Sequence, residues 1–131
     1  MTLAQKPCPR CGATKAITEF HASNRRAGAR VGDGTYVQSA CKTCQVADKE
    51  RVRSRNRDFL HSVKLASGCV DCGFRLHACA LDFHHVGVKT FGLGSRYAIQ
   101  APLSKLEAEI AECVVLCANC HRVRHHAEVE A

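Results

Sequence analysis

The 131-residue chain has no tryptophan and few other aromatic side chains, so it lacks the bulky groups that usually fill a protein core. Aromatic residues make up 5% of the chain, although 46% of its residues are hydrophobic. A core built from Ala, Val and a few Leu buries little apolar area per residue. The composition therefore excludes a domain held together by a large aromatic core and requires a second source of stability.

Long apolar runs are also absent. No segment approaches the roughly 20 apolar residues that a membrane-spanning helix needs, and residues 1–7 contain no apolar stretch of the kind found in secretory signals. We therefore expect no membrane partner and a cytoplasmic protein. In that reducing compartment cysteines bind metal more often than they form disulfides. The ten cysteines of the chain are then the candidate source of stability.

Acidic residues are scarce in the first half of the chain. Residues 1–66 contain 13 Lys and Arg against 5 Asp and Glu, a charge of +8, whereas residues 67–131 contain 6 against 7, a charge of −1. A basic half beside a nearly neutral, histidine-rich half suggests one part that binds a polyanion and another part that acts on it. The alternative is that the positive charge only keeps the surface soluble.

Eight of the ten cysteines occur in four C-x-x-C pairs. Each pair can bring two sulfur atoms to one ion, and two pairs complete the tetrahedral thiolate shell that structural zinc prefers. For the first two pairs the alternative is four cysteines that are unliganded or joined by disulfides. We predict two structural Zn²⁺ ions, one held by Cys8, Cys11, Cys41 and Cys44 and the other by Cys69, Cys72, Cys117 and Cys120. The remaining Cys79 and Cys113 lie in apolar, strand-like contexts and are expected to be small buried residues.

The cysteine pairs divide the chain into three predicted segments. Residues 1–45 form a zinc-ribbon-like module, residues 46–67 a basic linker helix, and residues 68–131 a second zinc-stabilised domain. The helix is expected to start near residue 43 and to stop at Gly68. In the second domain the apolar patterns predict strands near 80–84 and 113–116 and helices near 103–110 and 120–128. The predicted fold class is a small, zinc-stabilised α+β protein.

Arginines concentrate in two segments that are candidate contacts for a nucleic-acid backbone. One is a glycine-containing loop at 24–34, which is either a phosphate-binding loop or a disordered tip. The other is the middle of the linker helix, where the spacing places arginines in two stripes with few acidic neighbours. We expect most of these guanidinium groups to be free to track phosphates, the alternative being an ordinary solvated helix. The candidate DNA-binding residues are Arg25, Arg26, Arg30, Arg51, Arg53, Arg55 and Arg57.

Four histidines supply a candidate metal site in the second domain. His121 and His125 are four residues apart on a predicted helix, so they project from one face and can meet at a single ion. His84 and His85 are adjacent on a predicted strand and therefore point to opposite faces. One of this pair would ligate the ion, and the other would remain free to take a proton from water. Asp82 shares the face of His84 and could orient a ligand from behind.

These stretches together resemble the HNH nucleases of the ββα-metal, or His-Me finger, superfamily. The resemblance covers about residues 69–126 and rests on the C-x2-C pair at Cys69, the stretch LDFHH at 81–85 and the stretch CVVLCANCH-x3-H that starts at Cys113. The N-terminal unit, with CPRCG, ITEF and CKTC, is similar to the zinc module that precedes such domains in some phage and prophage proteins. The likeness implies a bacterial or phage-infected host cytoplasm.

The resemblance implies a ββα-metal domain that cleaves DNA with one divalent ion, Mg²⁺, Mn²⁺ or Ni²⁺, and leaves a 5′-phosphate. By position, His85 matches the general base of the family and His84 its first metal ligand. His121 matches the second ligand, and His125 a third ligand that only some members use. The expected function is therefore a metal-dependent DNA endonuclease that grips the phosphate backbone mainly through its basic half.

One position departs from the family pattern. Glu112 stands where the central Asn of the motif is expected, so Glu112 or Asn119 would have to pin the loop behind the base. The alternative functions are a non-catalytic two-zinc DNA-binding module and a zinc-stabilised interaction module within a phage packaging complex. No recognition helix for the major groove is evident, and arginines that contact phosphates carry no base code. The sequence thus predicts neither a target site on DNA nor an oligomeric state.

Overall fold

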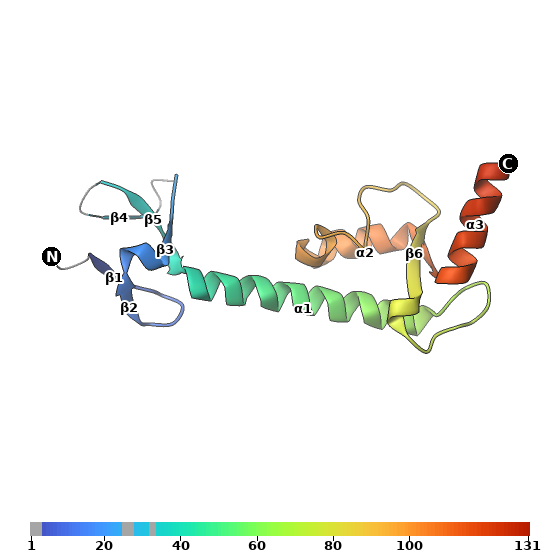
Figure 1. The fold of residues 1–131 in the computed structure, drawn as a ribbon, viewed down its shortest axis with the longest axis horizontal. Coiled ribbons are helices and arrows are strands. Elements are labelled where there is room, and N and C mark those ends of the chain that lie inside the picture. The colour runs from blue at the N-terminus through green and yellow to red at the C-terminus, as the bar shows by residue number, and fades with distance from the viewer. Residues whose placement is uncertain (1–3, 25–27, 32–33) are drawn as a thin grey trace. The chain divides into compact units, whose positions relative to one another are not determined.

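The computed structural model describes residues 4–24, 28–31 and 34–131. The chain divides into two compact units, Met1–Arg51 and Val52–Ala131. The division falls within helix α1 (Lys42–Ser67), which therefore contributes residues to both units instead of forming a segment of its own (Figure 1). Among the described helices, none combines the length and the apolar character that a membrane crossing requires.

Unit 1 consists of short strands around the first four cysteines. β5 lies between β3 and β4 in an antiparallel sheet, and β1 pairs with β2. Phe20 and Val37 pack with Cys8 and Cys41 in a core where none of the four is more than 4% exposed. Two of the four buried residues of this small core are therefore cysteines. The elements are β1 (Gln5–Pro7), β2 (Thr14–Ala16), η1 (Ile17–Glu19), β3 (Phe20–Ala22), β4 (Ala29–Arg30) and β5 (Tyr36–Cys41).

Helix α1 begins directly after β5 and ends at Ser67, directly before Gly68, within two residues of the predicted span. Gly68 has a φ of +66°, and its N–H donates to the carbonyl oxygen of Lys64 at 2.8 Å. A residue without a Cβ adopts this left-handed conformation at little cost, which explains why the helix stops there.

The second half of α1 is part of the core of unit 2. Leu60 packs with Leu93 and Leu106 in an apolar cluster. Asn56 is fully buried, and its Nδ2 donates to the carbonyl oxygens of Ala98 at 3.2 Å and Ala101 at 2.9 Å. A buried amide without hydrogen bonds would destabilise the fold. These two hydrogen bonds satisfy it and hold residues 98–101, which precede the helix that starts at Leu103, against α1.

Unit 2 has two antiparallel strands followed directly by a helix. The strands pair over five residues, from Leu81 opposite Cys117 to His85 opposite Cys113. Helix α3 packs on both strands, and β6 lies between α2 and α3 in Figure 1. The predicted strands and helices are all present, and the α+β class is confirmed. The elements are η2 (Ala78–Ala80), β6 (Leu81–His85), η3 (Ala98–Gln100), α2 (Leu103–Ala111), β7 (Cys113–Cys117) and α3 (Ala118–Glu130).

The two cysteines outside the C-x-x-C pairs, Cys79 and Cys113, differ in burial. The prediction that Cys79 is buried is wrong, because it lies in the η2 turn and is exposed. The strand begins only at Leu81, so the strand-like pattern does not extend back to Cys79. Cys113 is half-buried at the start of β7, where burial raises the pKa of its thiol to about 11 and its Sγ donates to the carbonyl oxygen of Glu109.

Candidate metal centres

The first cysteine cluster (Cys8, Cys11, Cys41 and Cys44) brings four sulfur atoms within 4.8 Å of one another. The Sγ atoms of Cys8 and Cys44 are 3.9 Å apart. Zinc–sulfur bonds of about 2.3 Å in a tetrahedron separate the sulfurs by about 3.8 Å. The backbone N–H of Cys41 also donates to Cys8 Sγ at 3.4 Å, as expected for a thiolate acceptor. The cluster therefore has the composition and spacing of a structural zinc site.

The second cysteine cluster (Cys69, Cys72, Cys117 and Cys120) has the same form in unit 2. The Sγ atoms of Cys72 and Cys117 are 3.7 Å apart. Cys117 is the N-cap of α3, and its sulfur accepts from the backbone N–H of Cys120 at 3.5 Å. A zinc ion held here would fix the residue at which α3 begins, and with it the position of His121, which directly follows Cys120.

The acidity of the thiols shows why both clusters require a cation. The backbone N–H of Cys41 lowers the pKa of Cys8 to about 6. Burial acts to raise the pKa of Cys69, but the backbone N–H donors of Cys117, Cys72 and Asp71 outweigh burial and lower it to about 6. The adjacent thiols of Cys41 and Cys117 in turn raise the pKa values of Cys44 and Cys120 to about 12. Four close thiols cannot all ionise without a metal ion, and the residues fit two structural Zn²⁺ ions.

An ion pair links the second cysteine cluster to α3. The guanidinium Nε of Arg124 donates to Asp71 Oδ2 at 2.9 Å, and a second guanidinium nitrogen donates to Oδ1. This two-point contact lowers the pKa of Asp71. Asp71 lies between the two cysteines of its pair, so the contact holds that turn against the helix that carries His121 and His125.

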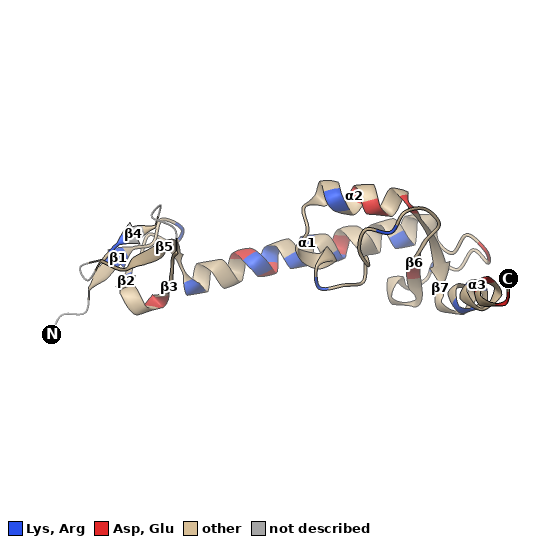
Figure 2. Ribbon diagram, turned by 90° about the horizontal axis from the view of Figure 1, so that it is seen from above, with Lys and Arg blue, Asp and Glu red and all other residues tan. Residues whose placement is uncertain are grey.

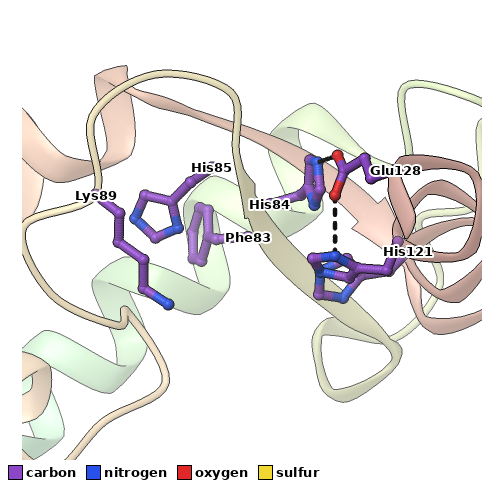
Figure 3. A pocket seen from close by; sticks show the side chains of 7 residues that line it. Phe83, His84, His85, Lys89, His121 and Glu128 are labelled. Carbon is purple, nitrogen blue, oxygen red and sulfur yellow. Dashed lines mark hydrogen bonds and ion pairs between the residues drawn. The ribbon is translucent and has the colours of Figure 1, made fainter. Parts of the chain in front are cut away.

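The histidine cluster (His84, His121 and His125) forms a third candidate centre. One ring nitrogen of each residue lies within 4.8 Å of the others, and the Nε2 atoms of His121 and His125 are 3.0 Å apart. Figure 3 shows His84 reaching the cluster from β6 and His121 from α3. The structure thus brings together the three histidines that the sequence proposed as ligands of one ion. His84 is only 4% exposed, and burial lowers its pKa, so it is a neutral imidazole with a lone pair available to a metal.

The hydrogen bonds behind these rings set which nitrogens are free. His121 Nδ1 lies 3.1 Å from Asp82 Oδ2, and His125 Nδ1 lies 3.1 Å from Glu128 Oε2. An ionised carboxylate only accepts, so each Nδ1 carries the proton and each Nε2 has a lone pair. Two lone pairs that face one another at 3.0 Å repel unless a cation lies between them. The donor set therefore fits a divalent ion, and Asp82 is placed behind His121 where it can orient that ligand.

His85 lies on the opposite side of β6 from His84, as strand alternation predicts (Figure 3). Its Nε2 is 2.8 Å from Oε1 of Glu109, a carboxylate that is only 4% exposed. The same oxygen accepts from the backbone N–H groups of Thr90 and Phe91 at 2.8 and 3.1 Å. Burial acts to raise the pKa of Glu109, but these donors outweigh it and the pKa is lowered. Glu109 is thus an ionised acceptor that holds the His85 ring.

His85 and the histidine cluster line one cavity of about 220 Å³. Its other lining residues are Phe83, Lys89 and Glu128, with Phe83 and Lys89 beside His85 in Figure 3. Lys89 has no ion-pair partner among the described residues. A histidine held by a carboxylate, three candidate metal ligands and a lysine therefore line one small cavity, a combination suited to a phosphate group.

Glu112 holds the loop that follows His85. Its carbonyl oxygen accepts from the backbone N–H groups of Val86 at 2.9 Å and Gly87 at 3.2 Å, and its Oε2 accepts from Val88 N–H at 3.2 Å. Asn119 lies elsewhere, exposed in the first turn of α3. Of the two residues considered for pinning this loop, Glu112 is the one that contacts it.

The arginines of α1 are less free than their sequence indicated. Arg51 pairs with Asp48 at 2.6 Å, a counter-charge three residues earlier on the helix, and Arg55 donates through two nitrogens to Asn56 Oδ1. Figure 2 shows acidic segments among the basic ones along α1. Arg53 and Arg57 also have interaction partners. The expectation that most of these guanidinium groups are unpaired is therefore wrong.

The candidate loop arginines are only partly described. Arg25 and Arg26 lie outside the described residues. Arg30 is exposed and belongs to β4, where it pairs with Tyr36 of β5. At this residue the chain is a paired strand and not the loop that the glycines suggested.

Sequence reasoning missed three residues of the site, Lys89, Glu109 and Glu128. Glu128 follows His125 by three residues and His121 by seven, so helical spacing could have placed it on the same face. Glu109 is 24 residues from His85 and Lys89 lies in an irregular loop, so neither has a local sequence signal. Their positions follow from the packing of α2 and of the loop it holds.

Comparisons with protein-family models, with curated proteins and with solved structures find no match to this chain.

Proposed function

We propose that unit 2 is a metal-dependent nuclease domain of the HNH kind, which hydrolyses phosphodiester bonds of DNA at the histidine cluster. The observation that carries the proposal is the 3.0 Å approach of the two Nε2 atoms of His121 and His125, whose Nδ1 atoms both face carboxylates. Three protein nitrogens leave positions open for water and a phosphate oxygen, as in catalytic metal sites. The two strands followed by a helix agree with the resemblance found in the sequence.

In this proposal His85 is the general base. Glu109 accepts from Nε2, so a neutral His85 has its free lone pair on Nδ1 and takes a proton from water through that atom. Glu109 keeps the ring in this tautomer and stabilises the imidazolium that forms. A divalent ion in the histidine cluster would neutralise charge on the phosphate and the leaving oxygen.

The loop after His85 places a positive charge on the same cavity. Backbone N–H groups on either side of Lys89 are bound by Glu112 and Glu109, so the backbone around Lys89 is held in place. Its ammonium group can then contact a non-bridging phosphate oxygen. The charge of +8 on residues 1–66 would supply the affinity for the DNA backbone, which falls as salt rises.

A plasmid assay tests the proposal. Zinc-loaded protein is incubated with supercoiled DNA and Mn²⁺ or Mg²⁺, with and without EDTA, beside the variants His85→Ala and His126→Ala. His126 is the matched control, because it is exposed on the same helix and pairs with Glu130 away from the cavity. We expect metal-dependent cleavage that His85→Ala lowers by about 10²–10⁴-fold, the usual contribution of a positioned base. His126→Ala should cleave like the wild type.

The alternative functions give different results in the same assay. DNA binding without cleavage under any metal would contradict the proposal and support a non-catalytic two-zinc DNA-binding module. A lack of DNA affinity at low salt would contradict both and leave an interaction module, such as a component of a phage packaging complex. Cleavage that persists unchanged in His85→Ala would reject His85 as the base.

A further inference from the structure

Glu128 lies between two of the three residues of the histidine cluster. Its Oε1 is 3.2 Å from His84 Nε2, and its Oε2 is 3.1 Å from His125 Nδ1. Figure 3 shows the carboxylate pointing from α3 toward His84 and the rings below it, and Glu128 lines the same cavity. Each carboxylate oxygen of Glu128 is therefore directed at a proposed metal ligand.

We propose that Glu128 is a fourth protein ligand of the ion, so that the centre has three imidazole nitrogens and one carboxylate oxygen. This inference rests on the proposed metal centre and adds one residue to it. Oε1 is the ligand atom, beside His84 Nε2. Oε2 accepts from His125 Nδ1–H and so keeps His125 Nε2 directed at the ion.

The distances between donor atoms support this assignment. Nitrogen and oxygen ligands lie about 2.0–2.2 Å from ions of this size, so neighbouring ligands of one ion are about 3–3.5 Å apart. The separation between Glu128 Oε1 and His84 Nε2 is 3.2 Å, and that between the Nε2 atoms of His121 and His125 is 3.0 Å. Both values match adjacent ligands around a common ion. The contact of Glu128 with His84 is also within ion-pair distance, and the group of ring nitrogens within 4.8 Å of one another does not include a Glu128 oxygen, so binding the ion requires the exposed Glu128 side chain to shift toward His121 and His125.

Charge balance supports it as well. Three neutral imidazoles leave both charges of a divalent ion uncompensated in a cavity where His84 is buried and Lys89 adds a further positive charge. One ligating carboxylate neutralises one of the two positive charges of the ion by direct contact. An oxygen ligand also favours Mn²⁺ and Mg²⁺ relative to a purely imidazole set, since hard ligands suit these ions.

Manganese binding tests the inference without measuring DNA cleavage. The protein is first loaded with two equivalents of zinc, one for each cysteine cluster, and desalted, because thiolates select the softer ion and imidazoles would take up any excess zinc. Mn²⁺ is then titrated, and free Mn²⁺ is quantified by electron paramagnetic resonance for the wild type, Glu128→Gln, Glu128→Ala and Glu130→Ala. Glu130 is the matched control, since it is an exposed carboxylate on the same helix that pairs with His126. Circular dichroism and zinc content verify that every variant is folded.

We expect one Mn²⁺ per wild-type chain, an affinity at least roughly tenfold lower in both Glu128 variants, and no change in Glu130→Ala. The glutamine variant decides between two roles, because its amide oxygen can still accept from His125 Nδ1–H but carries no charge. Wild-type affinity in Glu128→Gln, with or without a loss in Glu128→Ala, would overturn Glu128 as a ligand and leave the nuclease proposal standing. No Mn²⁺ binding by the wild type would overturn the metal centre itself.

Discussion

At the scale of single residues, one oxygen of Glu109 holds both His85, the proposed base, and the loop that follows it. Oε1 lies within hydrogen-bond distance of His85 Nε2 and accepts from the N–H groups of Thr90 and Phe91. A buried carboxylate is stable only when it is so satisfied. The proposed tautomer of His85 therefore depends on the same atom that fixes the loop.

Glu109→Gln removes the negative charge of this residue and keeps an oxygen atom in the same place. A glutamine Oε1 can keep all three hydrogen bonds while it loses the negative charge that stabilises an imidazolium. We expect DNA cleavage to fall by about 10–100-fold, the usual cost of altering a residue that supports a catalytic ligand. Single-turnover cleavage rates measure this, with Glu107→Gln, an exposed residue of the same helix, as the control. Equal rates in the two variants would contradict a role for the Glu109 charge.

The same substitution changes the response of the fold to acid. The pKa of Glu109 is lowered in the folded chain, so the unfolded state binds its proton more readily as pH falls. The stabilisation that Glu109 supplies is present above its ordinary pKa of about 4.5 and is lost below that pH. We expect the free energy of unfolding of the wild type to drop more steeply below about pH 4.5 than that of Glu109→Gln. Urea titrations at several pH values measure both slopes, and parallel curves would contradict the assignment.

At the scale of elements, helix α2 positions the loop that carries Lys89. Glu109 in its last turn and Glu112 directly after it bind the backbone of this loop at five N–H groups. A Cβ at Gly87 would collide with Glu112 Oε2, so a larger residue here would displace that carboxylate. The replacement of the expected Asn by Glu112 thus fits a glycine two residues after His85, the proposed base.

Gly87→Ala tests this contact. The new methyl group should displace the Glu112 carboxylate from Val88 N–H and destabilise the fold by about 0.5–1.5 kcal/mol, the usual net contribution of one hydrogen bond. Gly92→Ala is the control in the same loop, since an added methyl group there would have its nearest neighbour 4.0 Å away. Thermal unfolding measures both. In a Glu112→Ala background the effect of Gly87→Ala should largely vanish, and an unchanged effect there would contradict the proposed clash.

The elements themselves were predictable from local patterns, whereas several side-chain partners were not. Gly68, the apolar spacing before it and the two short apolar runs placed α1, β6 and β7 within one or two residues. Cys79 was misplaced because an apolar turn and an apolar strand look alike over three residues. The pairing of His85 with Glu109 spans 24 residues of sequence and depends on how α2 packs, which no local pattern encodes.

At the scale of the whole molecule, two cysteine clusters supply the stability that a small apolar core does not. Each of the two units contains one cluster, with Cys8 and Cys41 in the core of one and Cys69 in the core of the other. Structural zinc contributes on the order of 10 kcal/mol to folding in small domains. Removing zinc with a strong chelator should therefore unfold both units.

Elemental analysis distinguishes the two clusters. We expect two zinc ions per chain in the wild type. Cys41→Ser and Cys120→Ser should each bind only one zinc ion per chain, because each four-thiolate shell closes on one ion. Cys79→Ser, an exposed cysteine outside both clusters, should keep two. Cys120→Ser should also abolish DNA cleavage, because α3 would lose the ion that fixes the position of His121. Retention of two zinc ions in either cluster variant would mean that its cluster is misassigned.

The proposed chemistry depends most on whether the histidine cluster holds a divalent ion in addition to the two zinc ions. The most direct measurement is an anomalous difference map from crystals of zinc-loaded protein soaked in Mn²⁺, recorded on both sides of the manganese absorption edge. We predict one manganese peak bound to His84, His121 and His125, separate from two zinc peaks at the cysteine clusters. Two zinc peaks with no manganese among these histidines would contradict the proposed metal centre.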